Sequence, residues 1–260
     1  MYEKKIDKLE QKIDKERMKI KRSEDLDAVE SVFDLRTTKI IFNLMKKKII
    51  DEIFGAISTG KEANVYRATD PSGNSIAVKI YRTRNVEIQF MWKYVRGDPR
   101  FTHVRKNPLS LVYAWAEKEF KNLSRAEQAG VRVPHPIIAE KNVLVMEFIG
   151  KDETPAPKLK DVKLKKPIKV FNIIIDYIKK LYNDAHLVHG DLSEFNILMD
   201  NSNPVIIDIS QAVPLDHPNS IEFLIRDIKN IHWFFSQLKL KIPTPKEIYK
   251  YIIGTDENEY

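Results

Sequence analysis

The pattern of apolar and polar positions predicts a strand-rich region followed by a mainly helical one. Apolar residues that recur every three or four positions indicate helices, and short apolar runs between turn residues indicate strands. The first half predicts helices at 3–22, 35–48 and 112–129, and strands at 49–57, 63–68, 75–81, 133–139 and 142–148. This order predicts a five-stranded antiparallel sheet with one main helix.

The second half predicts helices with short apolar segments between them. The helices are expected at 168–183, 220–238 and 244–253, and the short segments at 187–188, 197–199 and 205–209. Residues 154–167 are rich in Pro and Lys and predict a connector. Residues 84–110 contain Gly97-Asp98-Pro99 and Asn107-Pro108, so we expect an irregular, partly mobile loop there.

Together these elements predict an α+β fold of two lobes. We expect a helical extension over residues 1–50, a sheet lobe over 51–149 and a reduced helical lobe over 150–260. A chain of 260 residues suits one such two-lobed unit, and 43% hydrophobic residues provide a sizeable core.

Composition limits the classes of function. The chain has no cysteine, which excludes disulfides, thiolate metal sites and a thiol nucleophile. No apolar run approaches the length of a membrane span, so we expect a soluble, cytoplasmic monomer with no membrane partner. The net charge of +7 is compatible with an RNA or nucleotide partner, although the charge alone favours a generally basic, soluble surface. For the basic stretch 158–169, a solvated linker is the favoured interpretation and an RNA contact the alternative.

The strongest chemical signal is the sequence His189-Gly190-Asp191 followed by Asn196, with Asp208 on the next predicted strand. Phosphoryl transfer from a nucleotide mainly requires positioning and neutralisation of phosphate charge. An Asp orients the acceptor hydroxyl and takes its proton, and an Asn and a second Asp hold the metal ion. We predict Asp191 as the base and Asn196 and Asp208 as ligands of Mg²⁺ or Mn²⁺.

The upstream partners of such a site occur in the expected order. Ala77-Val78-Lys79-Ile80 is a strand whose lysine would hold the α- and β-phosphates of ATP. The ion-pair partner of Lys79 should be a glutamate on the following helix. We favour Glu119, which stands four residues before the apolar Leu123, with Glu117 as the alternative.

Two further segments are expected to contact the nucleotide. The turn after the first strand contains one glycine, and its candidate phosphate-contacting residues are Ser58, Thr59, Gly60 and Lys61. The link between the lobes is predicted to meet adenine through its backbone, and its residues are Met146, Glu147, Phe148 and Ile149.

Several features of an ordinary protein kinase are missing. Glycine replaces arginine in the His-x-Asp triplet, and the metal motif is Asp208-Ile209-Ser210 in place of D-F-G. No A-P-E segment follows Asp208, and Arg226-Asp227 already belongs to the next predicted helix. We therefore expect a helical lobe that lacks the usual activation segment and peptide-binding subdomains.

These motifs together resemble the Rio family of atypical protein serine kinases, specifically its type-one, archaeal-like branch. The resemblance rests on residues 58–66, 77–82, 116–123, 143–150, 189–198 and 207–213. It implies an atypical kinase fold, use of ATP and Mg²⁺, autophosphorylation on serine, and an ATPase-like cycle in which Asp208 can also accept phosphate. It further implies a role in small ribosomal subunit maturation, with the pre-small-subunit particle and its RNA as partners.

Two other functions fit parts of the pattern. Aminoglycoside and choline kinases share the His-Gly-Asp motif and the metal-binding Asp, but usually carry a larger acidic insert for a cationic substrate. The basic, compact second half argues against that function. A non-catalytic scaffold for ribosome binding is the other alternative, and the retention of Lys79, Asp191, Asn196 and Asp208 argues against it.

Overall fold

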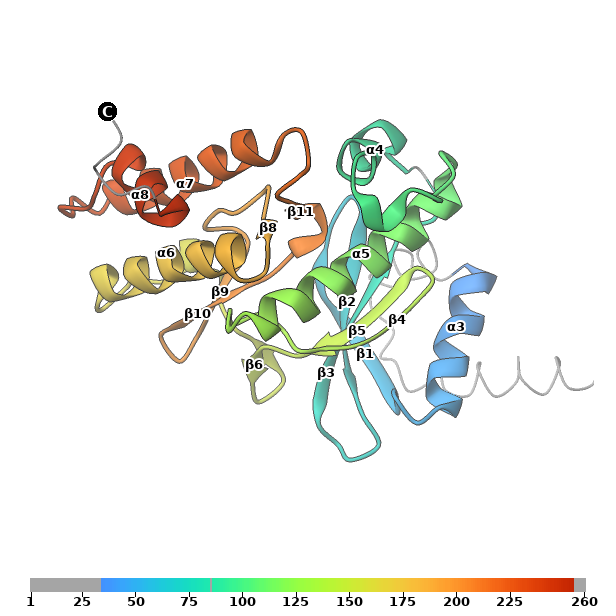
Figure 1. Cartoon of the computed structure of the whole chain (residues 1–260). Coiled ribbons are helices and arrows are strands. Elements are labelled where there is room, and N and C mark those ends of the chain that lie inside the picture. Colours follow the sequence, from blue (N-terminus) through green and yellow to red (C-terminus); the bar gives the residue numbers. More distant parts are fainter. Residues whose placement is uncertain (1–33, 85, 255–260) are drawn as a thin grey trace, which may run out of the picture.

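The structure is a computed structural model, and it describes residues 34–84 and 86–254. The helix predicted at 3–22 lies outside the described residues. The chain forms a sheet-containing lobe and a helical lobe side by side, which confirms the predicted α+β class and its two-lobed arrangement (Figure 1). Within the described residues, none of the helices combines the length and apolar character that a membrane crossing requires.

The first lobe contains an antiparallel sheet with the strand order β1-β2-β3-β5-β4, as far as the described residues show. The strands are β1 (Glu52–Thr59), β2 (Ala63–Thr69), β3 (Ser75–Tyr81), β4 (Pro136–Glu140) and β5 (Val143–Glu147). Helix α3 (Leu35–Lys46) covers one face, where Ile40, Ile41 and Leu44 pack against buried Val78 and Val145. Asp34 caps this helix by accepting a hydrogen bond from the Thr37 amide at 2.7 Å.

The other face of the sheet is covered by α5 (Pro108–Gln128). The helix begins four residues earlier than the predicted 112 because Asn107 caps it and Pro108 occupies its first turn. Trp115, Ala116 and Leu123 are buried in the main core. This helix carries both candidate partners of Lys79, so its packing on the sheet fixes one side of the site.

The segment 84–110 is more ordered than the sequence predicted. It contains α4 (Ile88–Val95) and the short 3₁₀ helix η1 (Pro99–Phe101). Tyr94 of α4 packs edge-on against Trp115, with ring centroids 5.9 Å apart, and it lies 5.4 Å from Phe223 of the second lobe. These contacts give the segment an apolar anchor, which is why the expectation of an irregular loop was wrong for residues 88–95.

The second lobe is built on three helices, α6 (Pro167–Asn183), α7 (Ser220–Ser236) and α8 (Pro245–Ile253). Short paired strands lie between α6 and α7, namely β8 (Leu187–Val188) with β11 (Val213–Pro214) and β9 (Ile197–Asp200) with β10 (Asn203–Ile206). The predicted connector contains one strand of the small β6 (Gly150–Lys151) and β7 (Thr154–Pro155) pair and the 3₁₀ helix η2 (Leu159–Asp161). The catalytic-loop candidates lie between β8 and β9, and Asp208 follows β10. The residue boundaries between the lobes remain a prediction.

Candidate active site

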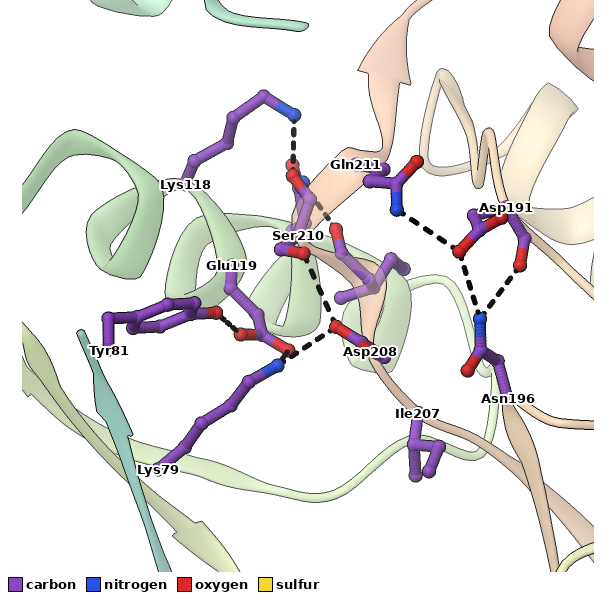
Figure 2. Close-up of polar contacts among 12 residues, drawn as sticks. Lys79, Tyr81, Lys118, Glu119, Asp191, Asn196, Ile207, Asp208, Ser210 and Gln211 are labelled. Carbon is purple, nitrogen blue, oxygen red and sulfur yellow. Dashed lines mark hydrogen bonds and ion pairs between the residues drawn. The ribbon is translucent and has the colours of Figure 1, made fainter. Parts of the chain in front are cut away.

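Lys79 joins the two lobes at the centre of the site (Figure 2). Its Nζ lies 2.8 Å from Glu119 Oε1 on α5 and 2.9 Å from Asp208 Oδ1 in the second lobe. Lys79 is buried, and although burial opposes its charge, the two carboxylates raise its pKa above the ordinary value. Glu117 is exposed and pairs with Lys121 at 2.6 Å, so the structure brings Glu119 and not Glu117 to Lys79.

Glu119 is itself held by a second donor. The Tyr81 hydroxyl, two residues after Lys79 on the same strand, donates to Glu119 Oε2. Burial raises the pKa of Glu119 to about 7, and the opposing charge of Lys79 offsets only part of this effect. The side chain of Glu119 is 1% exposed, so its orientation toward Lys79 is set by the packing of α5.

The backbone of Asp208 adopts the left-handed conformation. Its φ of 59° and ψ of 52° lie in the left-handed region, which Asp tolerates better than most residues with a Cβ atom. Burial acts to raise its pKa, but the side chain is 48% exposed, and the Lys79 charge decides the direction, which is downward. Asp208 is therefore an ionised carboxylate. Ser210 Oγ donates to the same Oδ1 at 3.3 Å, so Oδ2 carries neither of these bonds.

Asp191 is held by two amide donors from different segments. Asn196 Nδ2 donates to the Asp191 carbonyl at 2.8 Å and to Oδ2 at 3.2 Å, and Gln211 Nε2 donates to Oδ2 at 3.0 Å. Burial, and then the negative charge of Asp208, raise the pKa of Asp191. A carboxylate with a raised pKa and a fixed orientation suits a general base.

The site can hold a divalent metal ion. Mg²⁺ is usually bound by one or two protein oxygens together with substrate phosphates and water. The amide nitrogen of Asn196 faces Asp191, and Figure 2 shows its oxygen directed away from that residue. Among the described residues no cluster of three His, Cys, Asp or Glu forms a closed metal cage. Asn196 and Asp208 therefore fit an open site that is completed by phosphate oxygens.

The backbone of the catalytic loop is fixed by a residue that the sequence analysis did not single out for this role. Asp227 of α7 accepts hydrogen bonds from the amides of Gly190 and Leu192, each at 2.8 Å. Burial raises the pKa of Asp227 to about 7 even though both amides favour its ionised form. Arg226 donates to the Gly190 carbonyl. These contacts clamp the backbone on both sides of Asp191.

The loop after Asp208 is held in the same way by α5. The buried Lys118 donates through Nζ to the carbonyls of Ser210, at 2.9 Å, and Ala212. Asn122 Nδ2 donates to the carbonyls of Ile209, at 2.9 Å, and Ala212, at 3.1 Å. Helix α5 therefore does two things. It presents Glu119 to Lys79, and it holds the backbone of residues 209–212 through Lys118 and Asn122. Neither Lys118 nor Asn122 was predicted.

The predicted phosphate-contacting turn lies next to Lys79 across the sheet. Ser58 pairs with Val65, and Val65 pairs with Lys79, so the three side chains share one face. The other turn candidates, Thr59, Gly60 and Lys61, follow at the end of β1 and are exposed. Glu62, in the same turn, was not assigned a role. Burial and the nearby Asp208 charge raise its pKa to about 7.

The predicted adenine link leaves β5 beside the site. Met146 pairs with Ala77 on β3, and Phe148 and Ile149 are buried. The Glu147 carboxylate forms a bidentate pair with Arg132, with both distances 2.6 Å. The Glu147 side chain is therefore directed to Arg132, and a backbone contact between this link and adenine stays a prediction.

Comparison with known proteins identifies the family. Residues 64–248 match the model of the RIO domain. The chain belongs to the RIO family. It is 44% identical over 238 residues to the human serine/threonine-protein kinase RIO1, and the matched region covers 90% of this chain and 42% of that protein. It is 41% identical over 246 residues to the RIO-type serine/threonine-protein kinase Rio1 of Haloferax volcanii, and the matched region covers 95% of this chain and 84% of that protein.

A solved structure supports the kinase-like fold. The Rio2 kinase of Chaetomium thermophilum, in its ADP/Mg²⁺-phosphoaspartate complex, is similar with a TM-score of 0.61 and 25% identity. The match covers 84% of this chain and 66% of the other. The predicted kinase-like architecture is confirmed by this likeness and by the family match. The type-one resemblance is confirmed by the RIO1 relatives. The chain spans only part of the human relative, which is more than twice as long as the matched region.

Proposed function

We propose that the chain is a Mg-ATP-dependent atypical serine/threonine kinase with ATPase activity. The observation that carries the proposal is the Lys79 ammonium, which bridges Glu119 in one lobe and Asp208 in the other. In a kinase such a lysine holds nucleotide phosphates beside the metal-binding aspartate, so this contact supports a phosphate-binding role for Lys79 and Asp208. The family match and the kinase names of the relatives support it.

In the proposed reaction each residue has a limited task. Lys79 binds phosphate oxygens, and Ser58 with the turn residues covers the phosphates from the other side. Asn196 and Asp208 would hold a Mg²⁺ ion, which would supply neutralisation of the phosphate charge. Asp191 orients the acceptor hydroxyl and takes its proton as the oxygen bonds to the γ-phosphorus and the bond to ADP breaks. Gln211 and Asn196 keep Asp191 in place during this step.

We further propose that Asp208 can accept the phosphoryl group itself. Its Oδ1 is bonded to Lys79 and Ser210, and Oδ2 is the oxygen available for attack. Bond formation from Oδ2 to the γ-phosphorus releases ADP, and water then cleaves the acyl phosphate to regenerate the carboxylate. The phosphoaspartate in the related Rio2 structure supports this proposal. Such a cycle would suit a timed release from the pre-small-ribosomal-subunit particle, which is the cellular role that we propose.

The test is release of labelled phosphate from Mg-ATP by the wild type and by Asp208→Asn, with and without purified small-subunit particles. Asn tolerates the left-handed backbone of this position, so the variant changes the charge and little else. Asp216→Asn, an exposed site with the same chemical change, is the control. We expect turnover that is lost in Asp208→Asn, retained in Asp216→Asn and altered by the particle. Binding of ATP without any turnover by the wild type would favour the scaffold alternative.

A further inference from the structure

A basic surface lies beside the catalytic loop and has no task in the site described above. It consists of the exposed side chains of Lys160, Lys163, Lys165, Lys166, Lys169 and Phe195. Phe195 is 51% exposed although it directly precedes the candidate metal ligand Asn196. Its ring is therefore open to contact by a segment that binds beside the catalytic loop.

The basic surface is fixed to the catalytic loop by several contacts. The Lys160 ammonium lies over the Phe195 ring, 5.1 Å from its centroid. The Lys160 amide donates to the Glu194 carbonyl at 3.4 Å, and the Met199 amide donates to the Pro157 carbonyl at 2.8 Å. The connector therefore runs beside residues 194–199, and Lys160 lies against Phe195 of the catalytic loop.

The charge of this surface is largely uncompensated. Residues 156–169 contain six lysines and one acidic residue, Asp161. Asp161 lies 3.4 Å from Lys160, and both side chains are partly exposed, so this ion pair contributes little energy. It does not involve the other lysines. The first turn of α6 contains Lys169 and no acidic residue. The result is a concentrated positive charge on the connector, which Lys160 joins to Phe195 of the catalytic loop.

We propose that the basic surface selects acidic peptide segments as phosphate acceptors. This inference rests on the kinase activity proposed above and names its substrate class. Carboxylates on either side of the acceptor hydroxyl would pair with the lysines, while Phe195 packs on the peptide backbone or an apolar side chain. A single-stranded nucleic acid fits less well, because such sites interleave several aromatic rings with the cations and residues 156–169 contain none.

The chain itself contains two segments of the required chemistry, both outside the described residues. Ser23 is followed by Glu24, Asp25 and Asp27. Thr255 is followed at the same three positions by Asp256, Glu257 and Glu259. These segments are acceptors of the proposed class and provide test peptides whose sequences come from the protein.

The experiment compares two peptides that differ only in charge. One copies residues 251–260 with a C-terminal amide, and the other replaces its three acidic residues by Asn or Gln. The enzymes are the full chain, the variant Lys160→Glu/Lys163→Glu/Lys165→Glu, and the control Lys239→Glu/Lys241→Glu/Lys246→Glu. The control reverses three exposed lysines elsewhere and gives the same change in net charge.

We expect kcat/KM to favour the acidic peptide about tenfold or more in the wild type, since each exposed charge pair adds a factor of a few. The first variant should lose this preference while its kcat/KM for the neutral peptide stays within about twofold, and the control should keep the preference. Raised ionic strength should weaken the preference in the wild type. Equal preference in all three enzymes would overturn the proposal.

A binding measurement separates this proposal from the kinase activity. Fluorescence anisotropy with the labelled acidic peptide should show weaker binding to the lysine-reversal variant, even if phosphate transfer to either peptide is absent. In that case the kinase proposal fails and the acidic-peptide surface stands. A labelled poly-uridylate strand provides the opposite outcome. If it binds the wild type and loses affinity in the lysine-reversal variant, and the acidic peptide binds all three proteins equally, the basic surface is an RNA site. The peptide proposal is then wrong.

Discussion

Replacement of Lys118 by Met should change how the free energy of unfolding depends on pH. Lys118 is fully buried on α5, and its Nζ bonds the carbonyls of Ser210 and Ala212 in the loop after Asp208. Burial, and then the positive charge of Arg100, lower the pKa of Lys118 from 10.5 to about 7. Methionine fills a similar volume without a titratable group, so the variant removes the pH dependence of stability that comes from Lys118.

The sign follows from the two pKa values. Below pH 7 the amine binds its proton in both states, and above about pH 10.5 it binds none in either state, so the slope is confined to the interval between them. Within that interval only the unfolded chain binds the proton, so the free energy of unfolding of the wild type rises with pH. At 1.36 kcal/mol per pKa unit the rise is at most about 5 kcal/mol, and the two carbonyl acceptors, which favour the ammonium form, keep it below this limit.

The assay is urea unfolding of the wild type and Lys118→Met at pH values from 6.5 to 10. The wild type should gain stability relative to the variant as pH rises, and the loss of the carbonyl donor should add a pH-independent offset of about 1–3 kcal/mol. Lys121→Met, on the same helix with its side chain 41% exposed, is the control and should run parallel to the wild type. Parallel curves for the wild type and Lys118→Met would refute the assigned burial and charge state of Lys118.

Three further substitutions test the supports of the site. Asp227→Asn replaces one of the two acceptors of the catalytic-loop amides and should lower the free energy of unfolding by about 1.5–3 kcal/mol in urea titrations, with a matching loss of ATP turnover. Tyr81→Phe removes the donor to Glu119 and should cost about 0.5–1.5 kcal/mol, seen as a lower Tm. Gly190→Ala should reduce turnover and cost about 1–3 kcal/mol, because φ is 79° there and a Cβ would lie 3.1 Å from a backbone oxygen.

The residues that we propose to face the nucleotide stand out in the sequence because they lie in short, ordered motifs. Asp191 and Asn196 share one loop, so their spacing alone shows that they can act together. The choice of Glu119 over Glu117 followed from its spacing to the apolar Leu123, since residues four apart share a helix face. In the structure Glu119 and Leu123 are both buried, and Glu117 is exposed.

The residues that support these motifs could not be predicted, because their partners are backbone groups far away in the sequence. Asp227 bonds amides 35 and 37 residues earlier, and no spacing rule connects them. A weak signal existed, since Asp227 stands midway between buried Phe223 and Ile231 on the inner face of α7. A carboxylate at an otherwise apolar helical position indicates a buried polar partner.

The helix α4 was missed for a different reason. Gly97-Asp98-Pro99 and Asn107-Pro108 are true boundary signals, since η1 and α5 begin at the prolines. The eight residues of α4 between the boundaries were too few to outweigh those signals in a periodicity analysis. Their stability comes from the rings of Trp115 and Phe223, which only tertiary packing brings to them.

These supports explain how a helical lobe without a recognisable activation segment can still present an ordered site. In the described residues the catalytic-loop backbone is fixed by Asp227 and Arg226 of α7, and the backbone after Asp208 is fixed by Lys118 of α5. Both sets of contacts join buried or half-buried side chains to main-chain groups, so they form when the helices pack. Because Lys79 pairs with Glu119 of α5 and with Asp208, folding of the core sets the geometry of Asp191 and Asp208. The glycine at position 190 is consistent with this, because an arginine that waits for a phosphorylated loop has no task in such an arrangement.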